Sequence, residues 1–306
     1  MTTGFQVQTM REVFGATVTE LLERDPRLVV VLADISAAML ALAAERHPDR
    51  VVNVGIREQL LISTASGLAM TGLRPVVHTF SSFLVERPFE QIKLDLNHQD
   101  VGAVLVSAGA SYDMSDGGRS HQSPGDVALL DTLPGWTVYV PGHPDEADRL
   151  LRTAVAGDDR VYVRLSTQSN AVAHDGDRVR IVRQGRRGVV LAVGPMLDRV
   201  LAATEAMDVA VAYTSTVRPL DGYGLRAAVL AADRADVVVV EPYLAGTSAY
   251  LVNAALDDIP HRLRSLGVSR EFELRMYGTP ADHDAAHGLD AAGIAAAVRS
   301  FVDRGE

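Results

Sequence analysis

A glutamate at the boundary between a predicted strand and a predicted helix is the first residue that could do chemistry. Glu58 follows the short β-rich run 51–54 and the hinge residue Gly55, and it precedes the small-residue stretch 60–69. This order predicts a carboxyl group held at a packed helix N-terminus, where it can hold or pass a proton, rather than on a solvated face. An ordinary capping role in the first helical turn stays open on this spacing alone.

Two further side chains have types and positions that suit chemistry. His121 precedes Gln122 in a Gly-rich loop, and imidazole is suited to proton traffic near neutral pH, although a histidine in such a loop is commonly a surface or capping residue. Asp34 follows the apolar run 28–33, at the end of a predicted strand, where open α/β sheets bind ligands. A helix N-cap is the alternative role for Asp34.

Apolar, β-rich runs alternate with longer helical patterns along the chain, and these elements must position the three side chains. The alternation predicts an α/β fold with mainly parallel sheets. Residues 167–187 are polar and predict a linker, so we expect a first α/β domain over 1–170, a linker over 171–187 and a smaller second α/β domain over 188–306. Neither internal repeats nor low-complexity tracts interrupt this pattern.

Composition narrows the class of protein. The 306 residues include no Cys, which excludes disulfides and thiol chemistry, and no charge-free apolar run approaches the roughly 20 residues of a membrane span. Early charged residues argue against a signal peptide, so we expect a cytoplasmic protein without a membrane partner. A net charge of −10 argues against a nucleic-acid partner, because phosphate backbones are bound by clustered Lys and Arg.

Several ordered blocks carry a resemblance to a known family. The segment 55–59 (Gly-Ile-Arg-Glu-Gln) is followed by blocks at 72–84, 87–92, 120–122 and 133–141, and then by C-terminal blocks at 217–221, 240–243 and 288–294. In the order and spacing of these blocks the chain resembles the transketolase family. The first half of the chain is similar to the pyrimidine-binding domain of that family. The C-terminal blocks look most like deoxyxylulose-phosphate synthase and its relatives.

The resemblance implies a cofactor, thiamine diphosphate, and a role for each matching residue. Glu58 matches the glutamate that hydrogen-bonds the pyrimidine ring and activates the cofactor. His121 matches the histidine that contacts substrate oxygens. The matching cofactor-binding residues are Asp34, Ile56, Glu58, Phe83 and Phe89. For Phe83 and Phe89, ordinary core packing is the alternative.

The chain lacks one part that such an enzyme needs. In this family the diphosphate and Mg²⁺ are held by a Gly-Asp-Gly motif followed by an Asn, and the nearest string, 175–177, lies in the predicted linker and is typical of a turn. We therefore expect the chain to be one half of a split enzyme. A partner subunit would carry the diphosphate-binding domain and Mg²⁺, in an α2β2 assembly with the cofactor at the interface.

Departures from the family pattern bear on the substrate. Three positions that grip a sugar phosphate in transketolases are here occupied by Gly109, Ala38 and Thr167. Arg11 keeps a matching charge, although a helix-start surface Arg is an equal alternative. Gly117 stands where the family has a hydroxyl-selecting aspartate, unless a one-residue shift brings Asp116 into that role. We expect Arg11, Asp116 and His121 to bind a substrate without a terminal phosphate, or one that the partner grips.

The sequence thus predicts a transketolase-like transferase subunit that moves a two-carbon ketol or acyl-anion unit between small carbonyl compounds. Two alternatives remain open. A β subunit of a 2-oxo acid dehydrogenase shares the domain pair, and a non-catalytic scaffold subunit could keep the fold. The blocks around Glu58 and Phe83 favour the transketolase relationship, and a scaffold has no need of Glu58 or His121.

Overall fold

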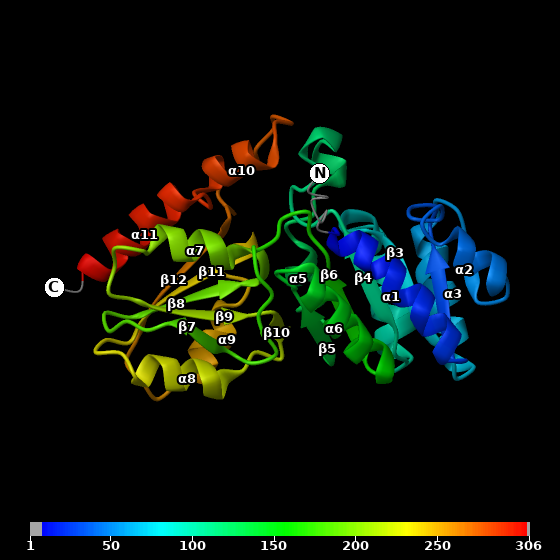
Figure 1. The fold of residues 1–306 in the computed structure, drawn as a ribbon, viewed down its shortest axis with the longest axis horizontal. Coiled ribbons are helices and arrows are strands. Elements are labelled where there is room, and N and C mark those ends of the chain that lie inside the picture. Colours follow the sequence, from blue (N-terminus) through cyan, green and yellow to red (C-terminus); the bar gives the residue numbers. More distant parts are fainter. Residues whose placement is uncertain (1–7, 305–306) are drawn as a thin grey trace, which may run out of the picture.

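Two mainly parallel sheets lie side by side in the computed structural model, which describes residues 8–304 (Figure 1). The first sheet has the strand order β10-β5-β6-β4-β3-β1-β2, and only β10 runs antiparallel to its neighbour. Its strands are β1 (Leu28–Leu32), β2 (Val51–Asn53), β3 (Arg74–Phe80), β4 (Val104–Ala108), β5 (Trp136–Tyr139), β6 (Arg160–Arg164) and β10 (Thr216–Arg218).

The second sheet has five strands in the order β12-β11-β8-β9-β7, with β7 antiparallel to β9. Its strands are β7 (Arg180–Arg183), β8 (Val189–Val193), β9 (Ala210–Thr214), β11 (Asp236–Leu244) and β12 (Arg262–Val268). This architecture confirms the predicted α/β class with two consecutive mainly parallel sheets.

The central strands form because their apolar side chains are covered on both faces, as parallel sheets require. Val30 and Val31, neighbours in β1, are both fully buried and belong to different core clusters. Strand geometry sends successive side chains to opposite faces, so each of them packs against a different helix layer. A continuous apolar run therefore becomes a central strand.

Helices cover both faces of each sheet (Figure 1). On the first sheet, one layer contains α1 and α6, and the opposite layer contains α3, α5 and the π-helical turns η1 and η2. On the second sheet, α7 and α11 lie on one face and α8 and α9 on the other. The first-half helices are α1 (Met10–Arg24), α2 (Ala41–Arg46), α3 (Glu58–Met70), η1 (Ser82–Glu86), α4 (Phe89–Gln91), η2 (Ile92–His98), α5 (Asp126–Leu130) and α6 (Pro144–Ala156). The second-half helices are α7 (Leu197–Ala203), α8 (Gly222–Leu230), α9 (Ala249–Ala255), α10 (Pro280–His287) and α11 (Ala291–Asp303).

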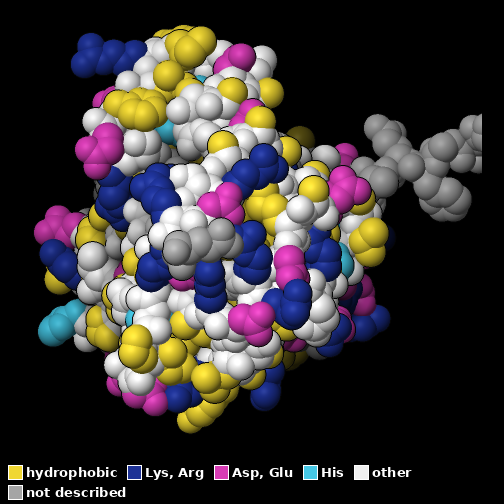
Figure 2. Space-filling view, turned by 90° about the vertical axis from the view of Figure 1, so that its left-hand side faces the viewer, with side chains coloured by type: hydrophobic (Ala, Val, Ile, Leu, Met, Phe, Trp, Pro, Cys, Tyr) yellow, Lys and Arg dark blue, Asp and Glu magenta, His cyan; other side chains and the backbone are white. Residues whose placement is uncertain are grey.

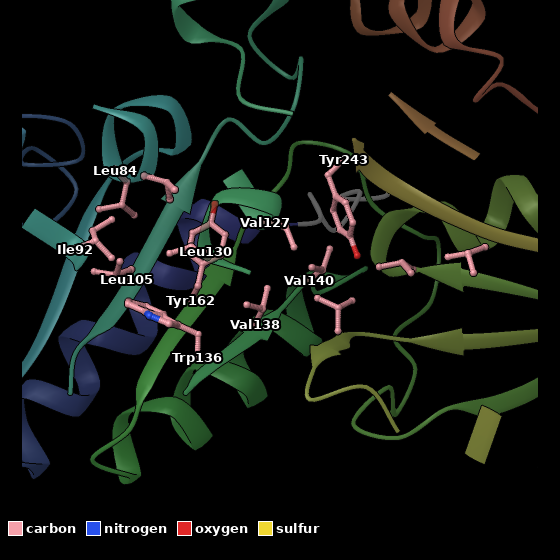
Figure 3. Close-up of a cluster of buried hydrophobic side chains, with 14 of the residues drawn as sticks. Leu84, Ile92, Leu105, Val127, Leu130, Trp136, Val138, Val140, Tyr162 and Tyr243 are labelled. Carbon is pink, nitrogen blue, oxygen red and sulfur yellow. The ribbon is translucent and has the colours of Figure 1, made fainter. Parts of the chain in front are cut away.

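The two halves share one hydrophobic cluster. It contains Tyr162 and Val140 from the first half together with Tyr243 from β11. Figure 3 shows part of this cluster, including these three side chains. Strand β10 also links the two halves, because it follows β9 of the second sheet along the chain but pairs with β5 of the first sheet. The halves are therefore interlocked by a strand as well as by packing.

Strand β7 lies inside the segment predicted to be a linker, residues 171–187, and it forms an edge of the second sheet. Part of that segment thus belongs to the second sheet. The division into domains over 1–170 and 188–306 stays a prediction, and residues 1–7 and 305–306 of those ranges lie outside the described part.

Two surface properties can be stated for residues 8–304. None of their helices combines the length and apolar character needed to cross a membrane. On the face shown in Figure 2, basic and acidic side chains are interspersed rather than gathered into patches of one sign.

Candidate active site

The carboxyl ends of β1, β3, β4 and β6 meet at one edge of the first sheet, and most of the predicted site residues lie there. This is the edge at which open parallel sheets bind ligands. Backbone strain is concentrated in its loops. Asp34, Ser36 and Ser111 all have φ angles between 51° and 64°, a region that side chains other than glycine rarely adopt.

Glu58 is the first residue of α3, and its position departs from that of a solvated capping glutamate. Gly55, with φ of 70°, makes the turn between β2 and α3. Only 2% of Glu58 is exposed, and its Oε1 accepts a hydrogen bond of 2.7 Å from Nη1 of Arg87. A buried carboxylate needs such a partner, because an unpaired charge in this environment is costly.

Aromatic rings and His121 gather beside Glu58. The guanidinium carbon of Arg87 lies 3.9 Å from the centroid of the Phe83 ring. The His121 ring meets Phe83 edge-on at 5.0 Å and Phe80 at 5.9 Å, and the two phenylalanine rings are 6.0 Å apart. Glu58, Phe83 and His121, far apart in sequence, are thus connected by direct contacts through Arg87 and the rings.

Phe80 and Arg87 are members of this cluster that the sequence pattern did not indicate. Phe80 is three residues before Phe83, a spacing that could have pointed to a second ring on the same side. Phe89, the second predicted ring, is half-buried at the start of α4. The ring placed beside Phe83 and His121 is that of Phe80.

His121 ends the short 3-10 helix η4 (Arg119–His121), and its loop is tightly held. Nδ1 of His121 lies 3.2 Å from the Gly117 carbonyl oxygen, and a Cβ on Gly117 would stand 2.9 Å from the imidazole. Asp116, in the preceding turn, is exposed, and its Oδ1 accepts a hydrogen bond of 3.1 Å from the Gly117 amide. The glycine at 117 therefore makes room for the histidine ring.

A fully buried ion pair fixes the base of the His121 loop. Arg164 at the end of β6 donates from Nε to Oδ2 of Asp126 at 2.7 Å, and the two side chains are 1% and 0% exposed. Arg164 Nη2 also donates to Ser111 Oγ at 2.7 Å, and Ser111 pairs with Ser123 across the loop. Tyr162 donates to the same Asp126 oxygen at 2.7 Å, and burial beside this carboxylate raises the pKa of the phenol.

A cavity of about 310 Å³ adjoins the cluster, and Phe80 forms part of its wall. Of the four positions that were compared with phosphate-binding residues of the family, Arg11, Gly109 and Thr167 line this cavity. Ala38 is not among its described lining residues. Among residues 8–304, the lining is Thr9, Arg11, Phe80, Ala108, Gly109, Met114, Leu165, Ser166 and Thr167. In the described part of this lining Arg11 is the one cation, and much of the remaining wall is apolar.

Hydrogen bonds behind the cavity orient Arg11. Its Nε donates to Ser36 Oγ at 2.9 Å, and Ser36 lies 2.8 Å from Nε2 of His78. Nδ1 of His78 faces the Val106 carbonyl oxygen at 2.7 Å, and burial lowers the pKa of His78 to about 4. The neutral ring therefore donates from Nδ1 to that carbonyl and accepts from the Ser36 hydroxyl at Nε2.

Asp34 and Ile56, the remaining predicted cofactor-binding residues, are both exposed at this edge. Asp34 and Asn53 are bonded reciprocally, because the Asp34 amide donates to Asn53 Oδ1 at 3.1 Å and Asn53 Nδ2 donates to Asp34 Oδ1 at 3.0 Å. Asp34 does not cap α2, whose N-cap is Leu40. Ile56 is 70% exposed, an unusual exposure for an aliphatic side chain next to a buried carboxylate.

Sequence and structural similarity connect this chain with known proteins. The family profile "Transketolase, pyrimidine binding domain" matches residues 6–171. The chain is 57% identical to an uncharacterized 33.6 kDa protein in the fasciation locus of Rhodococcoides fascians, over 98% of this chain and 96% of that protein. It is 33% identical to 1-deoxy-D-xylulose-5-phosphate synthase of Alkalilimnicola ehrlichii, over 95% of this chain but only 48% of the synthase. The chain thus spans about half the length of that enzyme.

A solved structure supports the fold over both halves. The protein described as "Split gene transketolase, inactive beta4 tetramer" superposes with a TM-score of 0.84 at 26% sequence identity. The match covers 96% of this chain and 98% of that one.

Proposed function

The chain belongs to the transketolase family, and we propose that it is one subunit of a two-component, thiamine-diphosphate-dependent enzyme of the transketolase type. Membership of this family implies dependence on thiamine diphosphate. The proposed reaction transfers a two-carbon ketol or acyl-anion unit between small carbonyl compounds. The observation that carries the proposal is a buried carboxylate, Glu58, linked through Arg87 and Phe83 to His121 at the ligand-binding edge of the sheet.

The residues present fit the pyrimidine ring of the cofactor. The guanidinium of Arg87 is itself a planar group that lies over Phe83 and hydrogen-bonds Glu58 Oε1. A planar ring with a hydrogen-bonding edge therefore matches this space in shape and chemistry. When bound, thiamine diphosphate supplies a thiazolium carbon that can lose its proton and add to a carbonyl group.

Each residue then has a defined task. Glu58, as a carboxylic acid, would donate a hydrogen bond to the pyrimidine nitrogen, and its burial keeps water from competing for that bond. Phe83 would pack against the ring. His121 would contact substrate oxygens, where a side chain that both donates and accepts protons is useful near neutral pH. Asp34, Ile56 and Phe89 are proposed to contact the cofactor as well.

The cavity beside Phe80 supports a substrate without a terminal phosphate. A phosphate dianion is bound well by several charge-assisted hydrogen bonds, and only Arg11 among the lining residues that the structure describes is a cation. Apolar Ala108, Met114 and Leu165 line the same space. Arg11, His121 and Asp116 are the proposed substrate contacts.

A partner subunit is proposed to hold the diphosphate and Mg²⁺. Within residues 8–304, no group of three or more acidic or histidine side chains is arranged to hold a metal ion. The string 175–177 is engaged otherwise, because Asp175 pairs with Arg180 and Asp177 with Arg149. The description of the similar solved protein as a split-gene transketolase, inactive as a β4 tetramer, supports an α2β2 assembly in which the partner completes the site.

The proton on C2 of bound thiamine diphosphate reports on Glu58 directly. In the assembled enzyme, Glu58→Gln keeps the shape of the side chain but removes the acid, so we expect C2 exchange with deuterated solvent to slow by about 10² to 10⁴-fold. Glu45→Gln, an exposed change on α2, is the matched control and should exchange at the wild-type rate. A wild-type rate in Glu58→Gln, with cofactor bound, would reduce Glu58 to a helix cap.

A further inference from the structure

We propose that Arg87 is a placeholder for the cofactor: its guanidinium occupies the space of the pyrimidine ring in the free chain and must leave before that ring binds. The inference rests on the proposed function and adds a step to it. It concerns an arginine that lies on the aromatic ring and pairs with the acid to which the cofactor is proposed to bind.

The two contacts of Arg87 are those that the cofactor ring would need. Its guanidinium carbon is 3.9 Å from the centroid of Phe83, which is the distance of direct stacking. Its Nη1 is 2.7 Å from Oε1 of Glu58, which is the length of a charge-assisted hydrogen bond. Two planar groups cannot occupy the same stacking position on Phe83, so ring and guanidinium exclude each other.

An arginine is well suited to hold this place. The guanidinium is planar and delocalised, it stacks on aromatic rings, and its N–H donors lie in its plane. It also supplies the charge that Glu58 needs in an empty site, because the Glu58 side chain is only 3% exposed. If Arg87 were removed, the buried Glu58 carboxylate of the free chain would lose its cationic partner. A buried charge that has lost its partner destabilises a folded protein.

The movement that the proposal requires is confined to one side chain. The Arg87 side chain is 40% exposed, so it borders solvent and can swing outward. Its backbone is held separately, because its amide donates to the Ser82 carbonyl at 3.2 Å and its carbonyl accepts from Gln59 Nε2 at 3.3 Å. Glu58, in contrast, is fixed at the start of α3. Binding of the cofactor therefore displaces the Arg87 side chain and leaves Glu58 in place.

A double-mutant cycle tests the exchange. Calorimetric titration of thiamine diphosphate with Mg²⁺ into the chain and its partner subunit should show about 3- to 30-fold tighter binding for Arg87→Ala than for the wild type, since the competing side chain is gone. In a Glu58→Gln background the guanidinium is no longer held by charge, so Arg87→Ala should change the affinity by less than about 3-fold. Arg46→Ala, which removes an exposed ion pair with Glu23, is the control and should leave the affinity unchanged.

The opposite results separate the possible failures. Weaker binding by Arg87→Ala in the Glu58 background would overturn the proposal and indicate that Arg87 contacts the bound cofactor. Unchanged binding would also overturn it and indicate that Arg87 plays no part in cofactor binding. No binding of thiamine diphosphate by the wild-type pair would refute the proposed function itself, and the inference with it.

A second measurement needs neither cofactor nor partner. Arg87→Ala should lower the melting temperature of the free chain, and about 10 mM methylguanidinium should restore part of that loss by entering the space over Phe83. The wild type and Arg46→Ala should not respond to methylguanidinium at this concentration. Arg87→Lys keeps a cation but loses the planar stack, so it should fold and melt between the wild type and Arg87→Ala. No loss of melting temperature in Arg87→Ala, or no response to methylguanidinium, would overturn the proposal.

Discussion

Removal of Arg164 tests whether the buried ion pair with Asp126 holds the site together. Arg164→Met keeps a long apolar stem but leaves Asp126 charged and 0% exposed. Breaking such a pair from one side costs about 3 to 5 kcal/mol. Asp126 keeps hydrogen bonds from Tyr162 and from the Val127 amide, at 2.7 and 2.8 Å, so we expect a loss near the lower end, about 3 kcal/mol.

Urea unfolding followed by circular dichroism measures this loss as a lower midpoint with an unchanged slope. The matched control is Arg226→Met, because Arg226 pairs with Asp258 on the surface, where their side chains are 33% and 61% exposed, and such surface pairs contribute little to stability. The double variant Arg164→Met/Asp126→Asn buries no charge and should recover more than half of the loss. A loss below about 1 kcal/mol in Arg164→Met, equal to that of the control, would refute this account of the pair.

Three other predictions concern substrate, pH and assembly. Thr167→Arg places a guanidinium at the cavity. It should raise kcat/KM for a phosphorylated donor by a factor that corresponds to about 1 to 3 kcal/mol of transition-state stabilisation, without a matching gain for a non-phosphorylated donor. A wild-type enzyme that already prefers the phosphorylated donor would contradict the proposal that the substrate lacks a terminal phosphate. Burial raises the pKa of Glu241 in β11 to about 7, above its ordinary value of 4.5, so its contribution to stability is complete below pH 4.5 and is lost as the pH rises through 7. Relative to Glu241→Gln, the wild type should therefore lose about 2 to 4 kcal/mol of unfolding free energy between pH 4.5 and 7.5 in urea titrations, and parallel curves would show that Glu241 does not titrate in this range. Light scattering and activity assays should find no transferase activity for the chain alone and an active α2β2 complex with its partner, whereas full activity of the single chain would end the two-component proposal.

The sequence predicts the fold well where a pattern is local. The continuous apolar run 28–33 contains β1 (Leu28–Leu32), which is buried on both faces, and the strand-to-helix turn at Gly55 starts α3 at Glu58. Strand β7 is different. Its Arg-Ile-Val-Arg sequence has no alternating pattern, and it becomes a strand only because the antiparallel edge of β9 is available to it.

The site could be predicted only in part, because its contacts join residues that are far apart in the chain. The family resemblance assigned Arg11, Gly109, Ala38 and Thr167 to one phosphate-binding region. Arg11, Gly109 and Thr167 line one cavity, whereas Ala38 is not among its described lining residues. The Arg87–Glu58 pair depends on where the residue after η1 meets the start of α3, and the Arg164–Asp126 pair depends on how the end of β6 meets the start of α5. Such geometry follows from tertiary packing, so no short sequence motif encodes it.

The position of β10 has a consequence for synthesis of the protein. Strand β5 receives its second neighbour only from residues 216–218, well downstream along the chain. At translation rates of 5 to 20 residues per second, a ribosome needs roughly 4 to 15 s to move from β5 to β10. During that interval the nascent first sheet has an open edge at β5, of the kind that pairs with strands of other chains. Coexpressed chaperones, or slower initiation that keeps nascent chains apart, should therefore raise the soluble yield.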